Sequence, residues 1–473
     1  MHLIDIIIFL LFTGGVVLFG CSFFNKKASS DEFTSAGRSL PGWVVGMSIF
    51  ATYVSSISYL GYPGKAFAGN WNAFVFSLSI PIASFFAAKY FVPFYRSQQS
   101  VSAYSFLEQR FGRWARVYAS SFYLLTQIAR MGSILYLLAL PMNELLGWDI
   151  QSIILITTVA IVAYSMVGGI KAVIWTEAIQ GIILIGGALL CLVLLLFDMP
   201  EGPSQLFEIA AANGKMSLGS LSLTLREPTF WVVLVYGLFT NMQNYGIDQN
   251  YVQRYMTARS TAEAVRSTMF GSLLYIPVSF VFVYIGTALF SFYTAQPDLL
   301  PDGVVGDKVF PYFIVHGLPA GVTGLVIASL FSAGMSTIST SINSSATIVL
   351  TDFYQKLRKR SVTPRQEMVV LYAASFAVGA LGIMVGLLMM QIDGVLDAWW
   401  KLASIFSGGM LGLFLLGLVS HTIKRTNVVI AVAVGLAVIA WMSFLAPLHT
   451  YLTIVLGTLA IFLAGFVLSK IIK

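Results

Sequence analysis

The sequence contains little charge. Only 10% of its 473 residues are Asp, Glu, Lys or Arg, whereas a soluble globular protein has about a quarter of its residues charged. So little charge on so long a chain argues against a cytosolic enzyme, a nucleic-acid-binding protein and a disordered scaffold. Apolar residues make up 58% of the chain, and one membrane-spanning helix needs about 20 of them. We therefore predict a polytopic protein of the lipid bilayer, with roughly a dozen spans.

Cysteine and histidine are also scarce. The two cysteines, Cys21 and Cys191, both lie in apolar stretches, which argues against a disulfide framework. The four histidines are scattered near the ends of predicted spans or in connections, so they offer no zinc-type site. Because neither a metal cluster nor an activated nucleophile is evident, we do not expect an enzyme.

Apolar runs bounded by charged or Pro/Gly-rich connections predict thirteen membrane-spanning helices. The runs lack the roughly ten-residue alternation of membrane-barrel strands, so the predicted fold class is an all-α integral membrane protein. The predicted spans are 3–24, 43–62, 73–95, 117–145, 150–167, 176–196, 230–251, 269–292, 320–352, 368–390, 402–420, 428–445 and 451–472.

Basic residues are distributed unevenly between the two sides of these spans. Twenty-one of the 27 Lys and Arg residues fall in one set of alternate connections and five in the other, while Arg130 lies within a span. Cytoplasmic connections carry the excess of Lys and Arg. This pattern predicts an external N-terminus and a cytoplasmic C-terminus.

Arg130 is predicted to lie about 14 residues, or ~20 Å, from the cytoplasmic end of its span. An ionisable residue at that depth is costly and is therefore a functional candidate. One interpretation is that backbone carbonyls and water satisfy the guanidinium. The other is that it binds the carboxylate of a solute through two hydrogen bonds. The acids that could neutralise it are predicted near span ends or in loops; these are Glu108, Glu144, Asp149, Glu177 and Asp248.

Residues 51–64, with the sequence ATYVSSISYLGYPG, interrupt the second predicted span. Ser and Thr compete for backbone hydrogen bonds, and Gly and Pro weaken or break a helix. A discontinuous helix near the middle of the membrane frees carbonyl groups that can bind a cation. Ordinary packing of a serine-lined helix is the alternative.

Two further segments are unusually polar for predicted spans. Residues 332–345, SAGMSTISTSINSS, carry nine polar side chains in fourteen positions, more than helix packing alone readily explains. Oxygen ligands without a cluster of acids suit a small monovalent cation. Residues 239–250, FTNMQNYGIDQN, supply amides that could bind a hydroxylated solute or form an interhelical network.

The span order predicts an inverted repeat. Without the first helix and the last two, ten spans remain as five plus five, and because five is odd the two sets start on opposite faces. The predicted organisation is an extra N-terminal helix at 1–24, repeats at 43–196 and 230–420, and two extra C-terminal helices at 428–473. The serine-rich broken span opens the first repeat, and the amide-rich span opens the second.

Four segments resemble motifs of the sodium:solute symporter family. Residues 168–181, GGIKAVIWTEAIQG, are similar to its most diagnostic segment, and 31–41, DEFTSAGRSLP, resemble the motif before its second span. The segments 103–112, AYSFLEQRFG, and 248–254, DQNYVQR, add two more matches in the family's order. The resemblance implies a LeuT-type 5+5 inverted repeat and sodium-coupled uptake by alternating access. It also implies a location in a bacterial inner membrane.

The resemblance also implies positions for sodium. The family's main sodium site would use the carbonyls of Ala51, Val54 and Ala333 and the hydroxyls of Ser336 and Thr337. Some members hold a second sodium with an acid in the diagnostic segment. In this chain its ligands would be Glu177, Ser336, Ser339 and Thr340, although the family often has Asp at the position of Glu177.

Within the family, the residues most resemble those of bacterial sialic acid symporters. Ser55, Ser58 and Arg130 match positions that meet the substrate carboxylate there. Tyr53 and Ser77 stand where a Thr and a Gln would contact the sugar. The full set of substrate-binding residues that we expect is Tyr53, Ser55, Ser56, Ser58, Ser77, Arg130, Asn241 and Gln243.

The expected function is therefore sodium-coupled symport of a carboxylated, sialic acid-like sugar acid. Two alternatives remain at this stage. One is a sodium-coupled symporter of a neutral sugar or another small organic solute, in which Arg130 is structural. The other is a channel, which would pass sodium without a solute. No nucleic-acid partner is expected.

Overall fold

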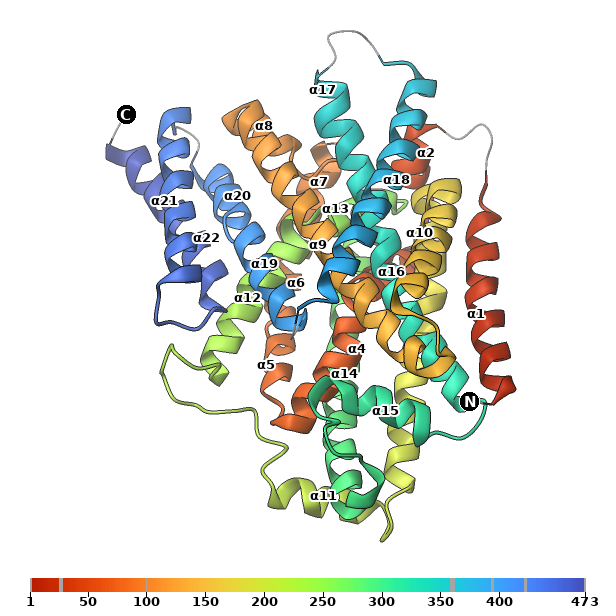
Figure 1. Cartoon of the computed structure of the whole chain (residues 1–473). Coiled ribbons are helices and arrows are strands. Elements are labelled where there is room, and N and C mark those ends of the chain that lie inside the picture. The colour runs from red at the N-terminus through yellow and green to blue at the C-terminus, as the bar shows by residue number, and fades with distance from the viewer. Residues whose placement is uncertain are drawn as a thin grey trace.

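The computed structural model describes residues 2–24, 29–98, 100–357, 362–392, 395–420 and 423–471. Within these ranges the chain is helical and carries no β-strand beyond an isolated bridge between Leu40 and Ala258. Long helices form one bundle, and the two termini lie at opposite ends of it (Figure 1). Residues 25–28, 358–361 and 472–473 lie outside the described ranges, and so do the basic residues among them that contribute to the predicted cytoplasmic charge.

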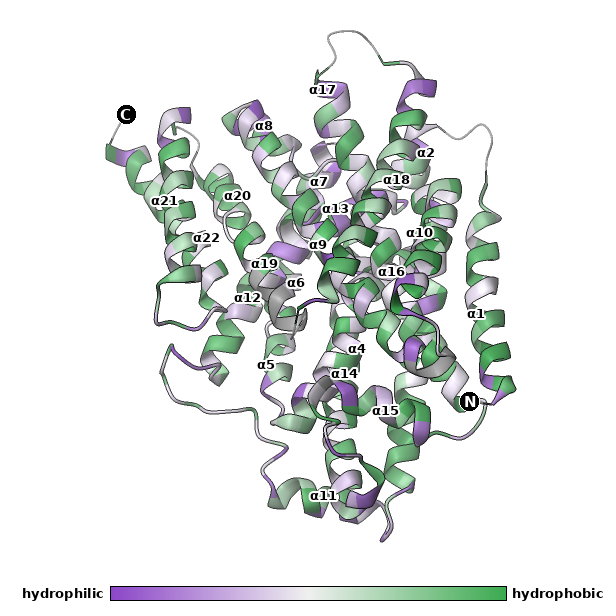
Figure 2. Ribbon diagram, viewed as in Figure 1, coloured by the Kyte–Doolittle hydropathy of each residue, from purple (hydrophilic) through white to green (hydrophobic). Residues whose placement is uncertain are grey.

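In the described ranges, twenty-two α-helical segments make up the bundle, joined by short 3-10 and π-helical turns. Apolar residues dominate the long helices, and many of the hydrophilic residues lie toward the two ends of the bundle (Figure 2). The helices are α1 (Leu3–Cys21), α2 (Ser30–Ser35), α3 (Gly42–Tyr53), α4 (Ser56–Ala68), α5 (Asn72–Leu78), α6 (Ile80–Phe86), α7 (Val92–Gln98), α8 (Ser105–Phe111), α9 (Arg113–Leu146), α10 (Ile150–Phe197), α11 (Pro203–Ala212), α12 (Phe230–Ile247), α13 (Gln249–Thr257), α14 (Thr261–Ala295), α15 (Val309–His316), α16 (Val322–Ile348), α17 (Gln355–Leu357), α18 (Pro364–Met389), α19 (Val395–Ser407), α20 (Met410–Val419), α21 (Arg425–Phe444) and α22 (Leu452–Ile471).

The exact count of thirteen membrane-spanning helices is not confirmed. Among the described residues, ten helical segments are long and apolar enough to cross a membrane, and the bent pair α3 and α4 would make eleven. The predicted spans 150–167 and 176–196 both fall in α10, one on each side of a kink at Gly169, where the backbone is not helical (φ 56°, ψ −156°). The predicted span 230–251 ends early, because α12 stops at Ile247, and α12 is not among the ten.

The predicted interruption of the second span is confirmed. Helix α3 ends at Tyr53, and Val54 and Ser55 have extended backbones with ψ of 125° and 172° before α4 begins at Ser56. The axes of the two helices differ by 54°. A second break lies between α12 and α13, where Asp248 has an extended backbone with ψ of 129°. The first helix of each predicted repeat is therefore discontinuous.

Helix α16 lies at the centre of the bundle. In its most apolar window 89% of the residues are buried, and it packs against α10, α9, α3 and α18. The N-terminal helix α1 covers α10 and α16 on one side, whereas the α21–α22 hairpin stands on the other side beside α20 (Figure 1). The serine-rich stretch of α16 thus faces protein rather than lipid.

Helices α3 and α14 cross at very short range. A Cβ atom at Gly271 of α14 would lie 2.3 Å from the carbonyl oxygen of Gly46 in α3. We expect Gly271→Ala to push the helices apart and to lower stability by about 1–3 kcal/mol, seen as a lower unfolding temperature in detergent. Gly186→Ala is the control, because nothing lies within 4 Å of the atom added there. Equal unfolding temperatures for the two variants would contradict the close crossing.

Candidate solute and sodium sites

A cavity of about 530 Å³ leads into the middle of the bundle. Its inner end is lined by Ser55 in the α3–α4 break and by Arg130 of α9, and its outer end by Gly69 and Asn70 beyond α4. Residues of α5, α12, α14, α19 and α22 complete the wall. Because Gly69 is exposed, the cavity opens toward the face that the charge pattern predicts to be external.

Five of the eight predicted substrate residues line this cavity: Tyr53, Ser55, Ser58, Arg130 and Gln243. The other three, Ser56, Ser77 and Asn241, are buried and do not line it. Asn241 accepts a hydrogen bond from the Tyr53 hydroxyl and donates one to the Ser79 hydroxyl at 2.9 Å. Asn241 therefore positions Tyr53, which lines the cavity, although Asn241 itself does not line it.

The Arg130 guanidinium carries one hydrogen bond and no ion pair among the described residues. Its Nη2 donates to the carbonyl of Thr52 at 3.2 Å. The ion pairs that the structure contains involve Arg116, Arg254 and Lys356 instead. Thr52 lies at the end of α3, next to Ala51. The bound carbonyl therefore belongs to the same interrupted segment as the predicted sodium ligands.

Two of the acids expected near span ends or in loops lie deep in the bundle. Glu177 has no exposed surface and lies in the second arm of α10, beyond the kink at Gly169. Asp248 lines the same cavity as Arg130, from the break between α12 and α13. Apolar runs indicate neither position, because Ser48, Arg254 and Thr340 from three other helices enclose Glu177, and α12 ends already at Ile247.

The five predicted oxygen ligands of the main sodium site lie together. The Ser336 hydroxyl of α16 is 3.1 Å from the carbonyl oxygen of Ala51, and the Thr337 hydroxyl is 3.4 Å from that of Val54. Both hydroxyls also approach the carbonyl oxygen of Ala333, at 3.0 and 3.2 Å. The set contains neutral oxygens from the α3–α4 break and from α16, which suits an alkali cation.

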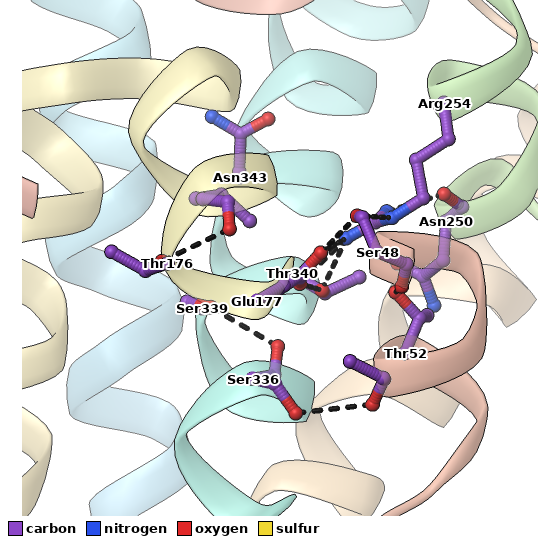
Figure 3. Close-up of polar contacts among 12 residues, drawn as sticks. Ser48, Thr52, Thr176, Glu177, Asn250, Arg254, Ser336, Ser339, Thr340 and Asn343 are labelled. Atoms are coloured by element: carbon purple, nitrogen blue, oxygen red, sulfur yellow. Dashed lines mark hydrogen bonds and ion pairs between the residues drawn. The ribbon is translucent and has the colours of Figure 1, made fainter. Parts of the chain in front are cut away.

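One helical turn further along α16, a buried ion pair joins four helices (Figure 3). Glu177 of α10 pairs with Arg254 of α13 at 2.7 Å, and neither side chain is exposed. The hydroxyls of Ser48 and Thr340 donate to the Glu177 carboxylate. Arg254 also donates to Ser48 at 2.7 Å, to Thr340 at 2.6 Å and to the Asn250 carbonyl at 2.5 Å. Each nitrogen of the Arg254 guanidinium thus donates at least one hydrogen bond.

Arg254 follows the predicted span 230–251, so the charge pattern places it in a cytoplasmic connection, whereas the structure buries it completely. The DQNYVQR motif marks this residue, but the charge pattern does not distinguish it from loop residues. Of the four residues predicted for a second sodium, Glu177 and Thr340 contact the Arg254 guanidinium. Ser336 faces the first site, and the Ser339 hydroxyl donates to the Ser336 carbonyl at 3.0 Å.

A third polar cluster closes the end of the bundle opposite the cavity mouth. Arg116 of α9 pairs with Glu108 at 2.6 Å and with buried Asp352 at 2.5 Å. Asp352 also accepts hydrogen bonds from Ser102 and Ser120. Although partial burial acts in the other direction, Arg116 and Lys356 hold the pKa of the Glu108 carboxyl below its ordinary value. Sequence reasoning missed this cluster, whose members lie far apart in the chain.

Comparison with known proteins decides the family. Residues 33–437 match the family model described as "Sodium:solute symporter family". The chain belongs to the sodium:solute symporter family. The resemblance inferred from the motifs is thereby confirmed.

Two known proteins resemble this chain over almost its whole length. The sodium/sialic acid symporter SiaT of Proteus mirabilis is 31% identical over 464 residues, covering 97% of this chain and 93% of SiaT. A solved structure of a Na+-coupled sialic acid symporter, in a substrate-bound outward-open state, is 29% identical with a TM-score of 0.94 and covers 100% of this chain and 98% of that one.

A more distant structure shows the fold alone. Mhp1, a nucleobase-cation-symport-1 family transporter solved in a closed conformation, has a TM-score of 0.63 at 16% identity and covers 95% of this chain and 96% of its own. The all-α transporter fold expected from the sequence is therefore confirmed.

Proposed function

We propose that this protein carries a carboxylated, sialic acid-like sugar acid into the cell together with sodium. The observation that supports this most is the state of Arg130, a guanidinium at the inner end of a cavity with one backbone acceptor and no ion pair among the described residues. Such a guanidinium can bind a carboxylate through two parallel hydrogen bonds. The sialic acid symporters similar to this chain support the same solute class.

The residues around Arg130 fit the rest of a sugar acid. Ser55 and Ser58 line the cavity beside the break and offer hydroxyls to the carboxylate. The rings of Tyr53, Tyr251 and Tyr275 line its inner part. Aromatic rings cover the apolar faces of a bound solute, while the amide of Gln243 can pair with its hydroxyl groups. We propose these groups as the solute site, with Asn241 supporting Tyr53.

Sodium is the second cargo. We propose that the carbonyls of Ala51, Val54 and Ala333 and the hydroxyls of Ser336 and Thr337 bind it. An ion held there joins the α3–α4 break to α16, so its binding favours the conformation in which the two repeats meet at this point. Thr52 lies in the last turn of α3, next to Ala51, and its carbonyl accepts a hydrogen bond from Arg130. Sodium bound at Ala51 therefore also helps to hold the carbonyl that orients the Arg130 guanidinium. A second sodium at Glu177, Ser339 and Thr340 remains a proposal.

The arrangement supports transport by alternating access rather than a channel or an enzyme. The cavity reaches the end that the charge pattern predicts to be external, while the Arg254–Glu177 and Arg116–Asp352 clusters join helices toward the other end. We propose that these clusters separate when the cavity opens inward. We further propose repeats at 43–196 and 230–420, an inner-membrane location, an external N-terminus and a cytoplasmic C-terminus.

Thermal unfolding of the purified protein tests this function. Sugar acids such as N-acetylneuraminate should raise the unfolding temperature in sodium and much less in potassium, because bound ligand stabilises the folded state by mass action. Equal stabilisation in the two salts would contradict sodium coupling, and no stabilisation by any sugar acid would contradict the solute class.

Substitution of the hydroxyl ligands tests the sodium site. We expect Ser336→Ala and Thr337→Ala each to raise the half-saturating sodium concentration for uptake about tenfold, since losing one ligand costs about 1.4 kcal/mol. Ser332→Ala is the matched control, because its hydroxyl bonds only to the Ala328 carbonyl of its own helix. Unchanged sodium dependence in both test variants would remove these hydroxyls from the site.

A further inference from the structure

Asp248 presents a carboxylate oxygen to the cavity. The residue lies in the break between α12 and α13, and its Oδ1 accepts a hydrogen bond from the backbone N–H of Asn250 at 2.8 Å, which caps α13. The second oxygen, Oδ2, has no hydrogen-bond partner among the described residues, and Asp248 lines the cavity. Helix capping therefore accounts for Oδ1, whereas Oδ2 remains available to a solute in the cavity.

Asp248 and Arg130 are electrostatic neighbours that do not form an ion pair. Both line the inner end of the cavity and interact through space, yet no nitrogen of Arg130 comes within 4.0 Å of the carboxylate. The site therefore offers a strong donor group and a strong acceptor side by side. A solute with only a carboxylate would satisfy Arg130 and be repelled by Asp248.

We propose that Asp248 is a specificity-determining residue, whose Oδ2 accepts a hydrogen bond from a hydroxyl group of the same solute whose carboxylate binds Arg130. This inference rests on the proposed function and narrows it to hydroxylated carboxylic acids over plain monocarboxylates. A hydrogen bond to a charged acceptor discriminates strongly, because an analogue without the donor leaves the charge unpaired. The two charges of the protein cancel, and the solute carboxylate is balanced by the sodium held at the α3 break.

Asp248→Asn separates this role from capping. The asparagine oxygen can replace Oδ1 as the cap of α13, which turns the amide NH₂ toward the cavity and converts an acceptor into a donor. Binding is measured by calorimetry in sodium with two acids: N-acetylneuraminate, which carries hydroxyls, and cyclohexanecarboxylate, which carries none. We expect N-acetylneuraminate to bind about tenfold more weakly or worse, whereas cyclohexanecarboxylate binding is unchanged or stronger.

Three results would overturn the proposal. If both acids bind more tightly by the same factor, Asp248 acts only as a charge that opposes anions. If neither changes, or both weaken alike, Asp248 does not select the solute. Asp248→Ser, which also keeps a capping oxygen, provides the same comparison should the asparagine variant fail to fold. Failure of wild-type protein to bind N-acetylneuraminate would instead contradict the proposed function itself.

Discussion

Arg130→Ala is expected to weaken sodium-dependent binding of N-acetylneuraminate roughly a hundredfold while the protein still folds. The guanidinium is only half-buried and has one protein partner, the Thr52 carbonyl, so its removal disturbs little of the wall. Loss of a bidentate, charge-assisted contact costs about 3 kcal/mol, which corresponds to roughly a hundredfold in affinity. Calorimetry on detergent-purified protein measures the loss directly, and the unfolding temperature without solute checks the fold.

Two controls isolate the role of the guanidinium. Arg130→Lys keeps the charge and loses the planar fork, so we expect an intermediate loss of affinity. Thr126→Ala alters a cavity-lining residue one turn away whose hydroxyl bonds to its own helix, and we expect little change. Unaltered binding or uptake of a sugar in Arg130→Ala would favour the alternative of a neutral solute with a structural arginine.

The Glu177–Arg254 pair carries the second large expected effect. Arg254→Met leaves a fully buried carboxylate without its partner, which typically costs about 3–5 kcal/mol. The double variant Glu177→Gln with Arg254→Met removes both charges and should recover most of that loss. The measurement is the unfolding temperature in detergent for the two single variants and the double variant.

The matched control is Glu108→Gln, which breaks the ion pair between Glu108 and Arg116. The Glu108 side chain is 23% exposed, so we expect a smaller loss of stability than for Arg254→Met. A double variant no more stable than Arg254→Met would contradict the account of the pair. Sodium titration of Arg254→Met also tests the proposed second ion site. Rescue by sodium would place an ion at Glu177, and the absence of rescue would leave the guanidinium as the partner of that carboxylate.

The break in the second span could be predicted because local chemistry determines it: the Ser/Thr and Gly/Pro pattern around Val54 weakens the helix wherever it packs. The proposed sodium ligands, including Ser336 and Thr337, came instead from the resemblance to the family, and the sequence pattern alone indicated only a hydroxyl-rich face on α16. Arg130 could also be singled out from the sequence, because a charged residue so deep in an apolar run is rare.

The remainder depends on contacts between distant segments. Arg254 was counted as a cytoplasmic charge because the apolar run ends at residue 251, although the chain stays buried for several more residues. Asp248 reached the cavity because α12 ends at Ile247, a boundary that hydropathy does not mark. Ser56 and Ser77 are polar and close to the site in sequence, but helix rotation turns them away from the cavity. Such rotations are set by packing against neighbouring helices.

Uptake into proteoliposomes tests the central claim most directly. Purified protein is reconstituted, an inward sodium gradient is imposed, and accumulation of labelled N-acetylneuraminate is followed for the wild type and Arg130→Ala. The account predicts accumulation above the external concentration in the wild type, none with potassium in place of sodium, and none in the variant. Accumulation without a sodium gradient, or undiminished accumulation in Arg130→Ala, would contradict it.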